Sequence, residues 1–95
     1  MSVVVMLTFQ AADGRYGALV EMFEAILPDT VKRPGAELVR AAGNPASGTI
    51  TLYEVWDRIE SQQAYIAWRT ERGDIAKLGA LLREPPQIEQ LTSLF

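Results

Sequence analysis

Residues 48–70, GTITLYEVWDRIESQQAYIAWRT, pass directly from a strand pattern to a helical one and contain both tryptophans of the chain, Trp56 and Trp68. Side chains at 49–57 alternate between two faces, and this alternation places Glu54 on the same face as Trp56. A strand that runs straight into a helix requires the helix to pack back onto a sheet. This stretch therefore predicts a layer of helix over a layer of strands.

The other segments show the same two patterns. Residues 2–10 are β-branched and apolar and predict a strand, whereas residues 15–27 repeat apolar side chains every three or four positions and predict an amphipathic helix. Further strands are predicted at 36–42 and 87–95. After residue 27, Pro28 can either end the helix or begin a further turn.

The second helix is predicted to run from Asp57 to about Glu71. Glu60 follows Asp57 at the spacing of a capping box, and Gly73 suits the left-handed position after a helix end. Asp74 can cap a further short helix. The predicted order is β-α-β-β-α-(α)-β, an α+β class with a ferredoxin-like, four-stranded antiparallel sheet.

Composition favours a single domain over residues 1–95, with 48% hydrophobic and 22% charged residues. The chain has no cysteine and no histidine, which excludes thiolate catalysis, histidine bases and histidine-ligated zinc or haem. A net charge of -3 without a basic cluster argues against a nucleic-acid partner. No segment is long enough to span a membrane, and we expect a cytoplasmic protein. We also expect that the protein binds no metal and no cofactor.

Two of the predicted strands are apolar on both faces. Val4 and Met6 lie opposite Val3 and Val5 in the first strand, and Tyr53 lies on the face opposite Glu54 in the third. Helices cover only one face of a ferredoxin-like sheet, so the other face would be exposed in a monomer. We therefore predict a homodimer in which two sheets pack face to face.

Candidate site residues gather on the second helix. Tyr65, Trp68, Arg69 and Arg72 recur at helical spacing, and opposite Trp56 they would form an aromatic pocket with guanidinium groups at its edge. Such a pocket suits a planar aromatic anion, which would stack on rings and pair with arginine. The alternative is that these aromatic residues are ordinary core.

Glu54 has an unusual position for a carboxylate because alternation directs it inward. Without a partner its pKa would rise, and it could then accept a proton from a phenol. The alternative is an ion pair with Arg40, Arg58 or Arg69.

Three segments together resemble the antibiotic biosynthesis monooxygenase family. They are RPG at 33–35, LYEVWD at 52–57 and AYIAWRT at 64–70. The resemblance implies a dimeric α+β barrel with a ligand cavity between each sheet and its own helices. It also implies cofactor-independent oxidation of quinone-type aromatic substrates, or haem degradation in some members.

Only some of the family's functional residues have a counterpart in this chain. Trp56 matches the family's tryptophan at the strand end, and Trp68 or Tyr65 matches the aromatic or histidine position on the next helix. Many members have a histidine on that helix, and characterised members have an asparagine near the end of the first strand, where this chain offers Thr8 or Gln10. The missing histidine argues against haem degradation.

The leading hypothesis is a cofactor-free monooxygenase of a small phenolic or quinol substrate. In it Glu54 and Arg69 are catalytic, and Trp56, Tyr65, Trp68 and Arg72 bind the substrate. The alternatives are a non-catalytic binding or interaction module, and an isomerase or lyase that uses Glu54 for proton transfer.

Overall fold

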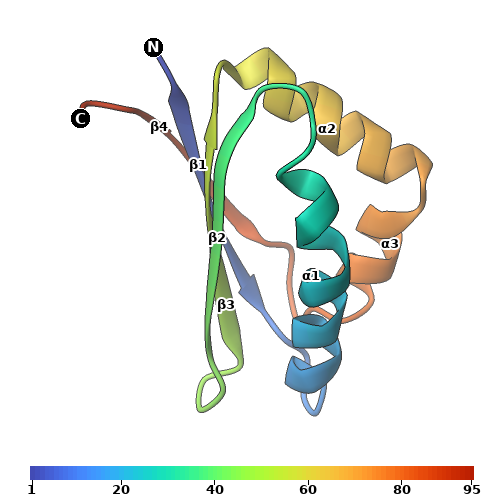
Figure 1. Ribbon diagram of the computed structural model, residues 1–95. Helices are drawn as coiled ribbons and strands as arrows, with labels where there is room; N and C mark the ends of the chain where they lie inside the picture. The colour runs from blue at the N-terminus through green and yellow to red at the C-terminus, as the bar shows by residue number, and fades with distance from the viewer.

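The computed structural model describes residues 1–95 and has two layers, a four-stranded antiparallel sheet and three helices on one of its faces (Figure 1). This is the predicted ferredoxin-like α+β fold. The elements are β1 (Val3–Gln10), α1 (Tyr16–Thr30), β2 (Ala36–Asn44), β3 (Thr49–Trp56), α2 (Ile59–Glu71), α3 (Asp74–Gly79) and β4 (Gln87–Thr92).

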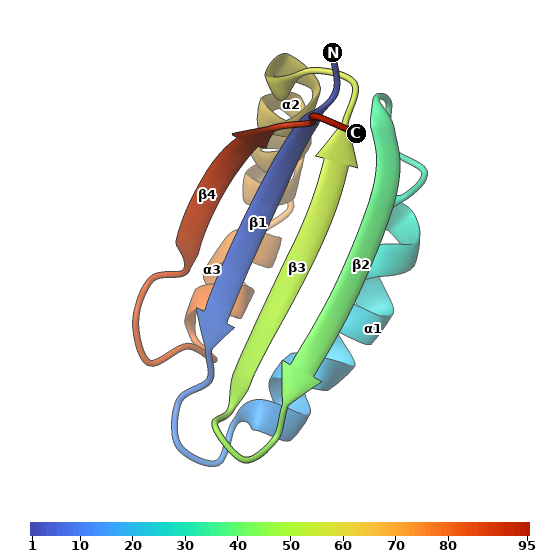
Figure 2. The same cartoon turned by 90° about the vertical axis from the view of Figure 1, so that its left-hand side faces the viewer.

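The strand order is β2-β3-β1-β4, so that β1 and β3 form the centre and β2 and β4 the edges (Figure 2). In the register of the central pair, Val5 lies opposite Glu54 and Leu7 lies opposite Leu52. These side chains point toward the helices. Glu54 is therefore held on the covered face by the two central strands.

The core lies between the sheet and the helices. Trp56 and Leu19 are completely buried, and Phe9 of β1 meets Phe23 of α1 edge to face with ring centroids 5.0 Å apart. Burial of such large apolar side chains is the main term that stabilises a two-layer domain. Trp56, at the end of β3, is thus core as well as a candidate site residue.

Several element ends differ from the sequence prediction. α1 extends beyond residue 27 through Pro28 to Thr30, which is the further turn that the sequence left open as an alternative. β2 extends to Asn44, where its hairpin with β3 closes. β4 ends at Thr92, and the side chains of Leu94 and Phe95 beyond it are exposed.

The predicted capping box at the start of α2 is wrong. The helix begins at Ile59 after Arg58, and no side chain caps it. Asp57 instead remains in the preceding turn, where its backbone N–H donates to the carbonyl oxygen of Gly35 at 2.8 Å. Gly73 is left-handed at φ 83° between α2 and α3, as predicted.

The face of the sheet away from the helices is uncovered in the single chain (Figure 2). Val4 on this face is only 5% exposed, because it lies between Val55 of β3 and Leu91 of β4. Tyr53 and Leu91 are 40% and 39% exposed. The open apolar area is therefore concentrated in a few side chains and does not cover the whole face.

None of the three helices combines the length and the apolar character that a membrane crossing requires.

Substitution of Gly35 tests the turn that joins α1 to β2. Gly35 has φ 86°, and an added Cβ would collide with the side chains of Asp57 and Ser61. We expect Gly35→Ala to lower the free energy of unfolding by about 1 kcal/mol through the positive φ and about 2 kcal/mol more through overpacking. Gly73→Ala is the control, since φ is 83° there but nothing lies within 4 Å. Equal losses in urea unfolding would contradict this explanation.

Candidate functional site

A cavity of about 530 Å³ lies between the sheet and the helices. This volume is within the range of small-molecule sites. Residues of all three helices, of β1, β3 and β4 and of segment 82–86 line it, and six of its twelve hydrophobic residues come from β1, β3 and α1. The apolar wall residues from these three elements are Leu7, Phe9, Phe23, Ile26, Leu27 and Leu52.

Glu54 is the buried carboxyl group of this cavity, with 3% of the residue exposed. Its Oε1 accepts a hydrogen bond from Nε1 of Trp56 at 3.0 Å. Its Oε2 accepts no hydrogen bond from the protein and is not sealed from the cavity. The predicted alternative of an ion pair with arginine is wrong, and one carboxyl oxygen is left for a ligand.

Burial raises the pKa of Glu54 above its ordinary value of 4.5, and the hydrogen bond from Trp56 offsets only part of this effect. The reason is that an ionised carboxylate loses most of its hydration in an apolar cavity. The neutral form of such a carboxyl group holds a proton, and its ionised form can accept one from a bound ligand. This is the environment that the sequence predicts for Glu54 if it lacks an ionic partner.

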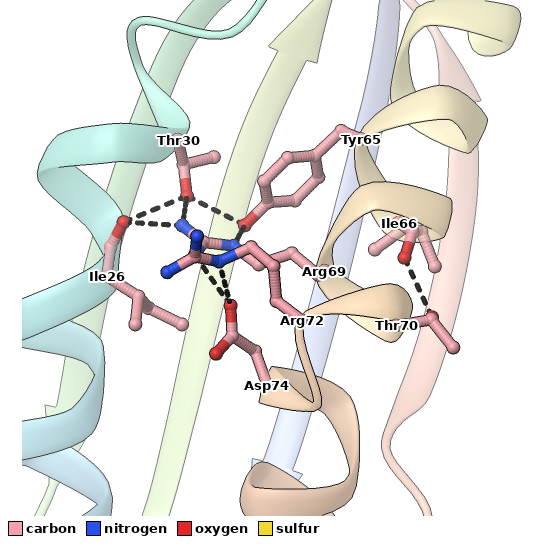
Figure 3. Close-up of polar contacts among 8 residues, drawn as sticks. All are labelled: Ile26, Thr30, Tyr65, Ile66, Arg69, Thr70, Arg72 and Asp74. Carbon is pink, nitrogen blue, oxygen red and sulfur yellow. Dashed lines mark hydrogen bonds and ion pairs between the residues drawn. The ribbon is translucent and has the colours of Figure 1, made fainter.

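Arg69 joins the three helices from the inside (Figure 3). Only 2% of the residue is exposed, and its Nε donates to Oη of Tyr65 at 3.0 Å within α2. Its Nη2 donates to the carbonyl oxygen of Ile26 at 2.8 Å and to Oγ1 of Thr30 at 3.3 Å, both on α1. Its Nη1 donates to Oδ2 of Asp74 at 2.9 Å on α3.

These contacts engage four of the five N–H groups that a guanidinium carries. Arg69 borders the cavity, but one N–H at most is free for a ligand. Hydrogen bonding by Arg69 lowers the pKa of Asp74 below its ordinary value of 3.8 and so keeps this carboxylate charged. The main role of the Arg69 guanidinium is therefore structural, as the partner of Asp74 in a buried ion pair.

The aromatic residues of α2 form a stack beside this ion pair. The ring centroid of Tyr65 lies 5.3 Å from that of Trp56 and 6.3 Å from that of Trp68. Guanidinium carbons of Arg33 and Arg72 lie 4.0 and 4.9 Å from the Trp68 ring centroid. The cluster on one side of α2 thus forms as predicted, with Arg33 as an additional member.

Only part of the predicted site reaches the cavity. Glu54, Tyr65 and Arg69 line it, whereas Trp56, Trp68 and Arg72 do not. Trp56 lies behind Glu54 and donates to it. The side chain of Arg72 is 53% exposed and donates to Asp74 at 3.2 Å.

Sequence reasoning missed two polar residues that the site depends on. Thr30 is fully buried, and its Oγ1 lies 2.7 Å from Oη of Tyr65. Asp74 was predicted only as a helix cap, yet it borders the cavity and pairs with Arg69. Only a three-dimensional arrangement identifies these roles, because Thr30 and Asp74 lie on α1 and α3 and both bind Arg69 of α2.

A second hollow of about 650 Å³ lies between α1 and the edge strand β2. Its wall contains Tyr16, Val39 and Ala41, with Glu24 as its one ionisable carboxyl group. Glu24 is exposed, in contrast to Glu54. The first cavity is therefore the better candidate for a chemical site.

Arg69 can be tested against Arg72 as a matched control on the same helix. Arg69→Met leaves Asp74 and Tyr65 without their buried partner, and we expect the free energy of unfolding to fall by about 3 kcal/mol or more. Arg72→Met removes an exposed pair and should cost about 1 kcal/mol or less. Chemical denaturation measures both variants, and an equal, small loss would contradict the role of Arg69.

The raised pKa of Glu54 predicts a pH dependence of stability. The folded chain keeps the Glu54 proton to a higher pH than the unfolded chain does, so this group makes the free energy of unfolding fall as pH rises from about 4.5 through the raised pKa. The pKa of Asp74 is lowered from its ordinary value of 3.8, so its titration affects stability only below this pH range. Glu54→Gln should remove the fall, so its stability relative to the native chain should increase as the pH rises above about 4.5. A stability difference that is constant with pH would contradict the assignment.

No protein-family model and no curated protein matches the sequence. Solved structures do match over almost the whole chain. Rv0793 from Mycobacterium tuberculosis superposes with a TM-score of 0.87 at 19% identity, covering 100% of this chain and 97% of that one.

Two further matches have descriptions of activity. A Deinococcus radiodurans protein provisionally described as an antibiotic biosynthesis monooxygenase gives a TM-score of 0.84 at 18% identity, over 98% of this chain and 93% of that one. SnoaB from Streptomyces nogalater, a cofactor-independent oxygenase, gives 0.79 at 13% identity, over 97% and 92%. The fold that the resemblance implies for a single chain is confirmed: the chain has the fold of the antibiotic biosynthesis monooxygenase structures.

Proposed function

We propose that this chain is an antibiotic biosynthesis monooxygenase that oxidises a small phenolic or quinol-type aromatic compound with molecular oxygen and without a cofactor. One observation carries the proposal. The buried carboxyl group of Glu54 faces an apolar cavity with one oxygen free of protein hydrogen bonds. The match to a cofactor-independent oxygenase of the same fold supports it.

The cavity wall suits an uncharged, largely apolar ring system. Phe9 and Phe23 line it together with aliphatic side chains, and the single buried carboxyl group offers one polar contact. A ligand hydroxyl can donate to Oε2 of Glu54 while the ring occupies the apolar space. Since Arg69 has most of its donors engaged, the substrate binds as a neutral phenol and not as a preformed anion.

Glu54 then acts as the proton acceptor. The ionised form of its carboxyl group takes the phenolic proton, and the resulting electron-rich anion is itself the reductant of oxygen. A peroxide forms at a ring carbon and loses water, so one oxygen atom enters the product, the other leaves as water, and the substrate supplies all four electrons that reduce the oxygen molecule. The protein contributes orientation, proton transfer and exclusion of bulk water.

The remaining predicted residues have supporting roles in this proposal. Trp56 fixes the carboxyl group of Glu54 by its hydrogen bond, and Tyr65 forms part of the cavity wall. Arg69 positions Tyr65 and places a fixed positive charge beside the cavity, where it stabilises the negative charge that develops on the substrate. Trp68 and Arg72 contribute by packing around Arg69 and by binding Asp74.

We also propose that the working unit is a cytoplasmic homodimer formed through the open sheet face. The half-exposed Tyr53 and Leu91 on this face support the assignment, because burial of apolar side chains favours association.

Oxygen uptake with a panel of naphthoquinols and anthrones tests the proposed activity. We expect consumption above the autoxidation rate, accompanied by water and an oxygenated product. Glu54→Gln should lower the rate by about 100-fold or more because the amide cannot take the proton, although it can still accept a hydrogen bond from Trp56. Glu60→Gln, at an exposed glutamate of α2, is the matched control and should leave the rate unchanged.

A rate no higher than autoxidation for every substrate, or equal rates for Glu54→Gln and the native chain, would overturn the oxygenase proposal. Thermal stabilisation by the same compounds without product would indicate a binding module. Turnover that needs Glu54 but consumes no oxygen would indicate an isomerase or lyase, which the buried carboxyl group also suits.

A further inference from the structure

A small hollow of about 220 Å³ lies between the turn that follows α1 and the beginning of α2, and we call it the α2 hollow. Its polar wall residues are Arg33 of the turn and Arg58, Glu60 and Ser61 at the start of the helix. Only Tyr65 lines both this hollow and the cavity beside Glu54. The α2 hollow is therefore separate from the proposed catalytic site.

Both arginines of this wall lack a partner within the chain. No ion pair involves Arg33 or Arg58, and neither side chain donates a hydrogen bond to another residue. Nε of Arg33 is buried with no acceptor, although buried N–H groups in folded proteins are normally paired. The two terminal nitrogens of Arg33 are not buried, so they remain available to a ligand.

Arg33 is nevertheless held in a defined position. Its backbone N–H donates to the carbonyl oxygen of Thr30 at 3.1 Å, and its guanidinium carbon lies 4.0 Å from the ring centroid of Trp68. Stacking on an aromatic ring uses the face of a guanidinium and leaves the N–H groups at its edge free. A ligand that binds this edge meets a group that is already ordered, which lowers the entropy cost of binding.

The same tryptophan ring is surrounded by further positive charge. Guanidinium carbons of Arg69 and Arg72 lie 4.6 and 4.9 Å from the Trp68 ring centroid, and Asp74 pairs with both arginines. Three guanidinium groups thus share one nearby carboxylate as their ionic partner. The charge of Arg33 is left unneutralised and attracts an anion to the α2 hollow.

Two acids lie near the α2 hollow without neutralising its arginines. Glu60 is exposed and pairs with neither arginine. Asp57 lies beside Ser61 at the turn with Gly35 but is not part of the wall. The wall therefore contains two positive charges against one negative charge, which favours an anionic ligand.

Hydrogen-bond donors reach the α2 hollow from two segments of the chain. Arg33 belongs to the turn, whereas Arg58 is the N-cap residue of α2 and Ser61 lies in its first turn. The hydroxyl of Ser61 makes no hydrogen bond within the chain, and no side chain caps the helix. Separate donors of this kind suit a tetrahedral phosphate group, whose oxygens point in several directions, better than a planar carboxylate.

We propose that the α2 hollow binds a phosphate group. Arg33 and Arg58 bind its charged oxygens, and the hydroxyl of Ser61 donates a further hydrogen bond. The positive end of the α2 dipole adds to the attraction. This inference goes beyond the proposed oxygenase function and does not depend on it.

Titration calorimetry with inorganic phosphate tests the site at constant ionic strength. We expect one phosphate per chain with a dissociation constant of about 1 mM or lower, because two guanidinium groups bind one anion. Phosphate should also change the tryptophan fluorescence, since Arg33 stacks on Trp68. Potassium chloride at the same ionic strength should give neither signal.

Substitutions distinguish this site from general attraction to a helix end. Arg58→Gln removes an exposed side chain, so the chain should fold normally while the dissociation constant for phosphate rises about tenfold or more. Arg33→Gln should weaken binding equally. Arg15→Gln is the matched control, because Arg15 is the exposed N-cap residue of α1, and it should leave the affinity unchanged. Glu60→Gln should tighten binding about threefold by removing the acid from the wall.

Phenyl phosphate distinguishes the two sources of such a group. Binding at least as tight as that of inorganic phosphate would support the site and identify a phosphorylated small molecule, whereas binding of inorganic phosphate alone would support it for the free ion. No saturable binding of either compound would overturn the proposal. Native affinity in Arg58→Gln, or an equal loss in Arg15→Gln, would also overturn it. These measurements need no turnover, so the failure of oxygen uptake would leave their outcome unaffected.

Discussion

The buried guanidinium of Arg69 is the interaction on which the helix layer depends. It binds the carbonyl oxygen of Ile26 on α1, the hydroxyl of Tyr65 on α2 and the carboxylate of Asp74 on α3. A buried cation is stable only when its donors are satisfied, so these three contacts fix the helices relative to one another. The helices in turn form the roof of the cavity over the sheet.

The cavity lies between this helical roof and the inward side chains of the sheet, of which those of β3 determine its chemical character. Leu52 and Glu54 alternate with outward side chains along the strand, and both reach the cavity. Trp56 fills the end of the sheet and fixes the carboxyl group of Glu54 through its indole N–H. The result is a proton-holding group in an apolar space, with a fixed positive charge near it that is already engaged.

The sequence predicted the strand and helix order well because periodicity is a local property. The two-faced alternation in 49–57 correctly directed Glu54 inward, and the spacing of Tyr65, Trp68 and Arg69 correctly placed them together. The capping box failed because Asp57 is held in the turn with Gly35, a contact between distant segments. Local spacing gave no information about this contact.

The role of Arg69 also depends on contacts between distant segments, which local sequence patterns do not report. From sequence it was a candidate for binding a ligand anion, whereas the structure gives it Thr30 and Asp74, residues on two other helices. The number of Arg69 N–H groups that remain free depends on how the three helices pack together. No sequence pattern within one helix contains this information. The buried position of Glu54, in contrast, follows from one strand alone.

The proposed proton transfer depends on the protonation of Glu54, which carboxyl ¹³C NMR measures directly. Glutamate labelled at the side-chain carboxyl carbon, with the Glu54 signal identified by its loss in Glu54→Gln, reports the pKa during a pH titration. We expect a midpoint above the ordinary value of 4.5 and a perturbation of this signal when a neutral naphthol binds. A midpoint at or below 4.5, with no response to the naphthol, would contradict it.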